Sequence, residues 1–472
     1  DPLYNFQLKN ANCIQGSGSV NTNDKYTIPE NFSLGSYAGY FTYQEFLDNL
    51  DSMASKYPNL ITVKQPINTF QTHQGRPIYW VKISDNPNTD EPEPETLYSA
   101  IHHAREPASL SQLIFYMWHM LENYNTDDEV QYLVNETEMY FVPVLNPDGY
   151  IINETYDPNG GGMWRKNARD NDNSSTLNGQ DGVDLNRNYD YQFGVSGVSS
   201  NPADDTYPGP NGFSEPETQA MKWFCEQHEF KFALNAHTYG DLLLHPFGYA
   251  TNDFAADHNY FQAITHHMVK ENNYVAQKSS DLYPAAGDSD DWMYDGDLGS
   301  KPKVYAMTPE IGNDNDGFYP QPSRIIPICK DNVFQNKRNA HLLKNYATIK
   351  ENGGNRLETS SGYIKYTIQR LGLESGNFDV SLTPLTGFDA VGSTNTHTGM
   401  NIMDIEEDSI SYTLSSSLSI GDPVKFILHL DNGLWVHRDT IEKIYGVPGN
   451  AYSDAIDNLS NWNTTGTWDL TP

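Results

Sequence analysis

Short apolar runs alternate with helical patterns between about residues 41 and 349, and this alternation limits the folds that the chain can adopt. Strands are expected at residues 60–70, 78–83, 97–101, 139–144, 232–236, 242–244 and 303–307, and helices at residues 42–57, 108–124, 215–229, 254–270 and 332–349. Strands alternating with helices predict an α/β domain whose sheet carries helices on both faces. Ser214, followed three residues later by Glu217, predicts a capping box at the start of the helix over residues 215–229.

The sequence changes character after the Gly- and Asn-rich segment 351–355, which is typical of a linker. Beyond it, apolar runs at residues 363–368, 378–382, 409–414 and 424–430 are separated by Gly, Asn, Asp and Ser, a pattern typical of a β-sandwich. We therefore expect an N-terminal extension (1–38), an α/β domain (39–350), a small β-sandwich domain (351–460) and the start of a possible further β module (461–472).

Length and charge exclude several functions. The 472 residues exceed what one hydrophobic core usually fills. The chain carries 62 Asp and Glu against 29 Lys and Arg, a formal net charge of -33, which repels nucleic acid and anionic membranes. No run approaches the roughly 18 apolar residues that a membrane helix requires. The sequence predicts neither nucleic-acid binding nor a membrane span.

The chain begins at Asp1 without an initiator Met or a basic-then-apolar leader. This start fits a processed, secreted protein, although a trimmed chain would look the same. We expect an extracellular, monomeric protein. Its three cysteines, Cys13, Cys225 and Cys329, are too few and too widely spaced for a disulfide scaffold, and allow at most one disulfide with one free thiol.

Two polar motifs directly follow predicted strands, at positions where open α/β sheets keep their sites. His103 and Glu106 follow the run at residues 97–101, and His237 follows the run at residues 232–236. Two His and one Glu form a catalytic zinc set whose fourth position is free for water. A zinc-bound imidazole also needs a partner for its other nitrogen, and Asp184 is a candidate.

With these residues in place, the chain resembles the pancreatic-type zinc metallocarboxypeptidases. Six segments match that family in order and approximate spacing: IHHARE (101–106), LNPDGY (145–150), MWRK (163–166), GVDLNRN (182–188), AHTY (236–239) and TPE (308–310). The resemblance covers residues 39–349 and none of the C-terminal region. It implies a mixed eight-stranded sheet flanked by helices, with zinc at one edge.

Carried over residue by residue, the resemblance implies a peptidase that removes C-terminal residues from peptides and proteins with free C-termini. One Zn²⁺ per chain would be bound by His103, Glu106 and His237, with Asp184 orienting His103. The remaining roles that the resemblance implies are Glu310 as general base, Arg165 as oxyanion stabiliser, Asn186, Arg187 and Tyr283 as ligands of the terminal carboxylate, and Arg105 as its guide.

Asp290 falls where the resemblance places the floor of the specificity pocket. A carboxylate at the base of a narrow pocket recovers its desolvation cost by pairing with a cation, which predicts a preference for C-terminal Lys or Arg. Leu244 and Gly248 match other pocket positions and would also admit apolar side chains, so mixed specificity stays open. Asp290 could instead simply belong to the local acidic run that includes Asp288 and Asp291.

Three further hypotheses remain open. A peptidase of the same fold could act on cell-wall or γ-glutamyl peptides, and a catalytically vestigial adhesin would keep the fold without the chemistry. Structural Ca²⁺ is a further possibility, in the loops at residues 170–173 and 314–316. The sequence contains neither a GxSxG elbow nor an HExxH helix, so serine hydrolases and thermolysin-like enzymes are disfavoured.

Overall fold

The computed structural model of the protein describes residues 25–174 and 176–447, which divide into two units. The first unit runs to Thr348 and also contains the loops Gln369–Asn377 and Thr398–Ile405. The second comprises Ile349–Ile368, Phe378–His397 and the described residues from Glu406 onward. The expected extension up to residue 24 and the possible module at 461–472 lie outside the described residues.

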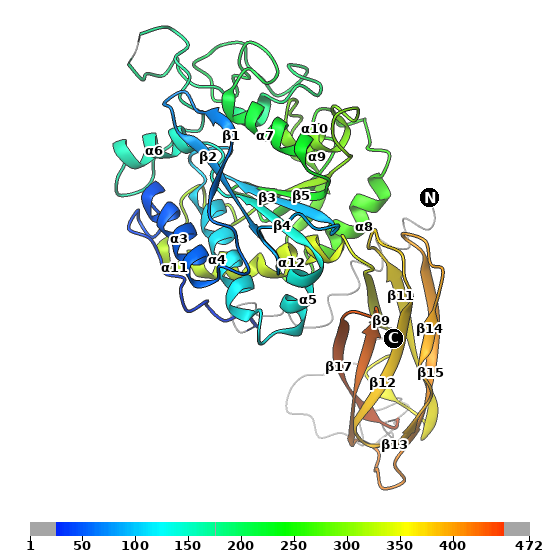
Figure 1. Cartoon of the computed structure of the whole chain (residues 1–472). Helices are drawn as coiled ribbons and strands as arrows, with labels where there is room; N and C mark the ends of the chain where they lie inside the picture. The colour runs from blue at the N-terminus through cyan, green and yellow to red at the C-terminus, as the bar shows by residue number, and fades with distance from the viewer. Residues whose placement is uncertain (1–24, 175, 448–472) are drawn as a thin grey trace, which may run out of the picture. The chain divides into compact units, whose positions relative to one another are not determined.

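The first unit is built on one eight-stranded sheet with the strand order β1-β2-β4-β3-β5-β8-β6-β7 (Figure 1). Its strands are β1 Gln65–Gln71, β2 Pro77–Ile83, β3 Glu95–Ala100, β4 Glu138–Val142, β5 Phe230–Ala236, β6 Leu242–His245, β7 Val275–Lys278 and β8 Tyr305–Glu310. β3 pairs in parallel with both β4 and β5, and β5 pairs in parallel with β8. β2 and β6 join this centre antiparallel, so the predicted mixed sheet is confirmed.

Helices cover both faces of the sheet, with α4 and α12 on one face and α7 on the other (Figure 1). The helices are α3 Tyr43–Lys56, α4 Pro107–Asn123, α5 Asp128–Glu136, α6 Pro147–Tyr156, α7 Pro216–Gln227, α8 His258–Met268, α9 Ser279–Leu282, α10 Ser289–Asp295, α11 Pro322–Asp331 and α12 Val333–His341. Strands β3 and β4 are buried along their whole length, as expected for strands covered on both faces.

The predicted capping box at Ser214 is wrong. α7 begins at Pro216 with Glu215 at the N-cap, and no side chain caps it. The Ser214 hydroxyl instead donates to Glu215 Oε1 (2.6 Å) and accepts from Asn188 Nδ2 (2.9 Å). The hydroxyl that the local sequence assigned to the helix end is therefore used by the adjacent Glu215 and the distant Asn188.

The predicted helix over residues 332–349 also ends too late. α12 stops at His341, and the chain enters strand β9 at Ala347. β-branched Thr348 and Ile349 favour the extended conformation that this strand requires. Helices α5, α6, α9, α10 and α11 and strand β7 were not anticipated from the sequence.

The second unit contains two sheets, with strand orders β10-β17-β16-β12-β14 and β13-β15-β11-β9. These strands are β9 Ala347–Glu351, β10 Arg356–Leu357, β11 Ser361–Arg370, β12 Phe378–Thr386, β13 Phe388–Val391, β14 Asn395–His397, β15 Ile405–Leu414, β16 Pro423–Asp431 and β17 Val436–Tyr445. Buried residues alternate along β11 and β16, as in a sandwich of two sheets. Segment 351–355 connects β9 to β10 within this unit, and Glu351 pairs with Lys443 there (2.7 Å).

Across residues 25–174 and 176–447, no helix combines the length and the apolar character that crossing a membrane demands.

Two neighbouring glutamates at the start of α7 are both buried, but their pKa values shift in opposite directions. Asn167 Nδ2 donates to both, at 2.8 Å to Glu215 Oε2 and 3.1 Å to Glu217 Oε2. Against the effect of burial, hydrogen bonds from His73, Ser214 and Asn167 lower the pKa of Glu215 to about 2. Glu217 is fully buried with Oε1 unpaired among the described residues, and burial raises its pKa to about 7.

Glu217→Gln should therefore stabilise the protein as the pH rises. The ordinary pKa of Glu217 is 4.5 and its folded-state pKa is about 7, so the folded chain binds more protons than the unfolded chain between these values. The native chain must lose stability as the pH rises through this window, and the Gln variant must not. At pH 8 we expect the variant to gain up to about 3 kcal/mol in unfolding free energy.

The measurement is denaturant unfolding of both proteins between pH 4 and 8. Glu229→Gln is the control, because the Glu229 side chain is 77% exposed and pairs only with Lys231 among the described residues. Parallel stability curves for native protein and Glu217→Gln would show that Glu217 is not protonated in the folded state.

Candidate metal centre and active site

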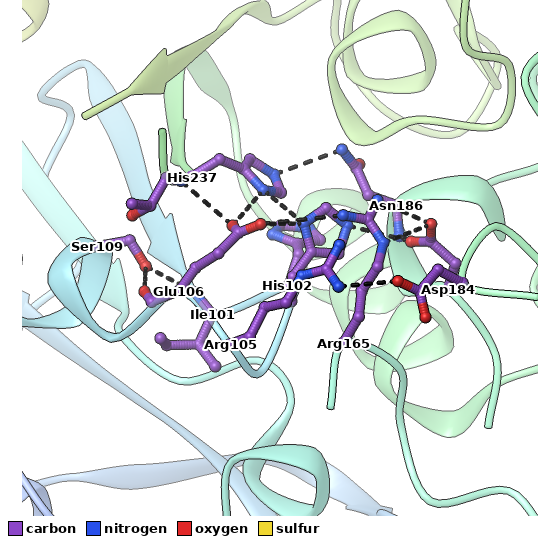
Figure 2. Close-up of polar contacts among 12 residues, drawn as sticks. Ile101, His102, Arg105, Glu106, Ser109, Arg165, Asp184, Asn186 and His237 are labelled. Atoms are coloured by element: carbon purple, nitrogen blue, oxygen red, sulfur yellow. Dashed lines mark hydrogen bonds and ion pairs between the residues drawn. The ribbon is translucent and has the colours of Figure 1, made fainter. Parts of the chain in front are cut away.

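The three residues predicted to bind metal meet at the carboxyl ends of two neighbouring strands. His103 and Glu106 follow β3, and His237 follows β5, its parallel neighbour. All three side chains are buried, and one ligand atom from each lies within 4.8 Å of the other two. Figure 2 shows the Glu106 carboxylate pointing toward the His237 ring.

The ligand atoms of this cluster carry lone pairs and lie so close together that a cation or a proton must lie among them. His103 Nε2 lies 3.1 Å from Asp184 Oδ1, and we assign the ring proton to this nitrogen because the carboxylate can only accept it. His103 Nδ1 then presents a lone pair to Glu106 Oε1 (2.8 Å) and to His237 Nδ1 (3.0 Å). His237 Nδ1 lies 2.9 Å from Glu106 Oε2. Two imidazole nitrogens and a carboxylate are ligands that suit Zn²⁺, so this set fits the metal.

Asp184 connects the metal cluster to Arg165. Arg165 donates from Nε (3.0 Å) and Nη2 (2.8 Å) to Asp184 Oδ2, while Asp184 Oδ1 faces His103 (Figure 2). Although burial opposes ionisation, Arg165 and His103 hold the pKa of Asp184 well below its usual range. The carboxylate therefore stays charged and fixes both the imidazole and the guanidinium.

A strained residue sets the direction of the ligand loop. Ile101 adopts a left-handed conformation (φ 53°), which is costly for a β-branched residue, on the order of 1–3 kcal/mol. Its carbonyl accepts from Asn146 N (3.0 Å), and Ser109 Oγ donates to the Glu106 carbonyl (2.7 Å). These bonds hold the turn that carries Glu106 back toward His237 (Figure 2).

Glu310 ends β8, the strand beside β5, and forms a parallel bridge with His237. Burial, together with the nearby Glu106 carboxylate, raises the pKa of Glu310 to about 8. The guanidinium of Arg165 also approaches this cluster, with Nη1 3.9 Å from Glu106 Oε1. The structure thus brings a basic carboxylate and a buried cation close to the metal ligands.

Arg187 is a buried cation with no acidic partner. Its side chain donates to the carbonyls of Gly197 (3.1 Å) and Asn186 (2.7 Å), and only 3% of the residue is exposed. Within the described chain, no carboxylate oxygen lies within ion-pair distance of it. Tyr283, which is half-exposed, has its ring centre 5.9 Å from the guanidinium carbon.

The other two predicted substrate residues, Asn186 and Arg105, lie in different surroundings. Asn186 Nδ2 lies 3.4 Å from His237 Nε2, and its Oδ1 accepts from Ser289 N (2.9 Å). Arg105 pairs with Asp205 (2.8 Å) and stacks over the ring of Phe318 (4.3 Å).

Asp290 lies in the first turn of α10, against the carboxyl ends of β5 and β8. It accepts from Asn235 Nδ2 and from Thr308 Oγ1, each at 2.8 Å. Burial, reinforced by the Asp288 carboxylate, raises the pKa of Asp290 to about 7. Neither partner was anticipated, although Asn235 is a polar residue inside an otherwise apolar strand and could have indicated the contact.

His102 is a second buried residue to which the sequence analysis gave no role. Its Nε2 lies 3.0 Å from the Tyr189 hydroxyl, and its ring packs 5.4 Å from the ring of His237. Burial lowers the pKa of His102 well below its usual range, so the ring is neutral. The neutral His102 ring therefore packs against the His237 ring and helps to hold it in place.

The structure does not support the Ca²⁺ hypothesis. Asp316 offers both oxygens to Arg324 (2.9 and 3.0 Å). In the other loop, Asp172 and Asp181 accept hydrogen bonds from backbone N–H groups and from the Asn178 amide.

Cys225 and Cys329 are buried free thiols, and Cys13 lies outside the described residues.

A family model described as zinc carboxypeptidase matches residues 46–335. The chain belongs to the zinc carboxypeptidase family. It is 30% identical over 334 residues to a zinc carboxypeptidase of Saccharothrix mutabilis subsp. capreolus, covering 68% of this chain and 73% of that protein. It is also 30% identical over 309 residues to carboxypeptidase A2 of Mus musculus, covering 64% and 69%.

Solved structures agree with this assignment. A crystal structure of thrombin-activatable fibrinolysis inhibitor matches with a TM-score of 0.57 and 26% identity, over 64% of this chain and 74% of that one. Carboxypeptidase A from Helicoverpa armigera shares the fold with a TM-score of 0.55 and 24% identity, over 71% and 80%. The family resemblance and the hydrolase class predicted from the sequence are confirmed, and the family implies Zn²⁺ as the cofactor.

We predict about one zinc per chain in this zinc carboxypeptidase, held by the two-His-one-Glu cluster. His237→Ala should lose the metal, and Asp184→Asn should weaken its binding by about 10- to 100-fold because the partner of His103 is weakened. Glu310→Gln, which leaves all three ligands intact, should keep the metal. Zinc analysis after dialysis against graded chelator measures all four proteins. Equal zinc retention by His237→Ala and native protein would place the metal elsewhere.

Proposed function

We propose that this zinc carboxypeptidase removes single residues from the C-termini of peptides and proteins, with a preference for Lys and Arg and some tolerance of apolar residues. The observation that carries the proposal is the environment of Arg187. A buried guanidinium without an acidic partner is costly, and a bound carboxylate would neutralise it.

A guanidinium matches a carboxylate through two parallel hydrogen bonds. Arg187 spends Nε and one terminal nitrogen on backbone carbonyls, which fix its plane and leave Nη2 for a ligand. Asn186 and Tyr283 flank it, and we assign all three to the substrate's terminal carboxylate, with Arg105 guiding the substrate inward. Since the main-chain carboxylate occurs only at a chain end, such a site makes the enzyme an exopeptidase.

The residues around the metal cluster supply the chemistry. A zinc ion bound there would polarise the scissile carbonyl and lower the pKa of a bound water to about 7. Glu310 accepts the proton of the attacking water and later delivers it to the departing amine, and burial makes it a stronger base than an exposed carboxylate. Arg165, held by Asp184, offers positive charge to the oxyanion that develops during attack.

Asp290 supports the preference for basic residues. It is 2% exposed, and its neighbours Asn235 and Thr308 are neutral donors that leave its charge uncompensated. A cationic side chain entering from the active site would pair with it, and Leu244 with Gly248 would accommodate the methylene stem.

Peptides with a free C-terminal carboxylate should be cut at least about 100-fold faster than the same peptides capped as amides, because Arg187 loses its charged partner with the amide. Arg187→Met should erase most of this difference. Arg187→Lys keeps the charge but lacks the fork, and should fall between the two. The measurement is kcat/KM on matched acid and amide peptides, with zinc content as the control for folding. Equal rates on acid and amide would indicate an endopeptidase.

Peptides that differ only in the last residue test the specificity. We expect kcat/KM for Arg and Lys to exceed that for Glu by at least about tenfold, and Asp290→Leu to lose the basic preference while gaining on Leu and Phe. Undiminished cleavage of Arg and Lys peptides by Asp290→Leu would rule out Asp290 as the selector.

The same assays address the alternative hypotheses. Faster cleavage of γ-glutamyl or cell-wall peptides than of ordinary α-linked peptides would favour the related peptidases, and hydrolysis that disappears with chelator would contradict the vestigial adhesin. Secretion and the monomeric state stay predictions.

A further inference from the structure

A second group of metal-ligand side chains lies where the turn between β1 and β2 meets the start of α7. It consists of His73, Glu215 and Glu217, and one ligand atom from each lies within 4.8 Å of the other two. His73 Nε2 is 2.7 Å from Glu215 Oε2. One imidazole and two carboxylates are ligand types that bind zinc and similar ions.

Glu217 has a carboxylate oxygen that the fold does not use. The residue is fully buried, and its Oε2 accepts from Asn167 Nδ2 (3.1 Å). Its Oε1 is inaccessible to solvent and has no hydrogen-bond donor among the described residues. Burial raises the pKa of Glu217 most, and His73 and Glu215 are the charged groups that act on it, so this carboxylate lies beside both. A buried, unpaired carboxylate oxygen costs stability unless a cation or a proton binds it.

The Glu215 carboxylate is held in place by several donors. Ser214 Oγ (2.6 Å) and Arg169 Nη1 (2.8 Å) donate to its Oε1, and Asn167 Nδ2 (2.8 Å) donates to its Oε2. The contact of Oε2 with His73 is the one that a metal ion can replace by lying between the two ligands. Because Arg169 compensates part of the negative charge, we expect weaker metal binding here than at the catalytic cluster.

His73 opens the cluster to solvent. Its side chain is 29% exposed. The turn that carries it is closed by the hydrogen bond from Thr72 N to Arg76 O (2.9 Å) and is held to the domain by the bond from Gln74 N to Asp148 Oδ2 (2.9 Å). Ligands of a tetrahedral zinc ion lie about 3.3 Å apart, so the exposed imidazole has to move outward only slightly to admit the metal.

We infer that His73, Glu215 and Glu217 form a second divalent-metal site, which binds Zn²⁺ or a similar transition-metal ion and ties the β1–β2 turn to α7. Water completes the coordination on the exposed side of His73. A ligand set with an imidazole nitrogen favours Zn²⁺, Co²⁺ or Ni²⁺ over Ca²⁺, which prefers oxygen ligands alone. The inference does not depend on the proposed function, because the three residues take no part in the peptidase chemistry.

The competing explanation is that protons occupy the cluster. Against the effect of burial, the hydrogen bond to Glu215 raises the pKa of His73, and burial raises the pKa of Glu217 to about 7. A proton on each side chain would satisfy the cluster without any metal. A metal ion would displace these protons, so the two explanations differ in how many metal ions the chain binds.

The test is a calorimetric titration with zinc chloride of the full chain, preloaded with one zinc, at pH 8, where protons compete least. His73→Gln and Glu217→Gln each remove one ligand, and Glu217→Gln is nearly isosteric. His228→Gln is the matched control, because His228 is a partly buried histidine that pairs with one glutamate, Glu95 (3.1 Å). We expect the native protein and His228→Gln to bind a second zinc. In the other two variants this second step should weaken by at least about tenfold.

A second measurement separates this site from the catalytic cluster. His237→Ala lacks a ligand of that cluster, so zinc added to it should raise its melting temperature through the second site alone. The double variant His237→Ala/His73→Gln should lose most of this rise. The inference is overturned if the native protein binds no second zinc, if His73→Gln or Glu217→Gln leaves the second step unchanged, or if His228→Gln weakens it equally.

Discussion

The Glu106 carboxylate lies between two imidazoles whose Nδ1 atoms face it and each other, at 2.8 to 3.0 Å. Acceptors at such distances repel unless a cation or a proton lies among them. The rest of the centre is arranged around this constraint. Asp184 accepts a hydrogen bond from His103 Nε2, Arg165 pairs with the Asp184 carboxylate, and the neutral His102 ring packs against His237. These contacts hold each side chain in one orientation and one protonation form, which a metal site requires.

The sheet makes this convergence possible because β3, β5 and β8 are adjacent and parallel. Their carboxyl ends meet at one edge, so His237 and Glu310 are neighbours although 73 residues separate them in the sequence (310 minus 237). The ligand loop after β3 needs more than topology. Left-handed Ile101 stores strain there, and the hydrogen bonds of Asn146 and Ser109 hold it. Such backbone strain is typical of a loop whose conformation is set by the direction its side chains must take.

The polar residues that lie at the ends of buried strands were predictable from the sequence. His103 and His237 each follow an apolar run, and the ordered motifs around them carry the family resemblance. Tertiary competition was not predictable. Ser214 has the spacing of a helix cap, but Asn188 and Glu215 take its hydroxyl.

The acids of α10 show the same limit. The sequence places Asp288, Asp290 and Asp291 within four positions and cannot distinguish them, because what separates them is which oxygen meets a donor from a distant strand or loop. The loops Gln369–Asn377 and Thr398–Ile405 belong to the first unit, although in the sequence they lie between strands of the second.

The two buried arginines differ in how much of their charge is already paired within the protein. Arg165 gives two donors to Asp184, so its charge is largely compensated before any ligand arrives. Arg187 gives its donors to neutral carbonyls and keeps its full charge. We therefore expect a substrate's permanent carboxylate to bind Arg187 rather than Arg165. Under the proposed function, the weaker field of Arg165 would serve charge that appears only during the reaction, and favouring such transient charge over a ground-state anion is what accelerates catalysis.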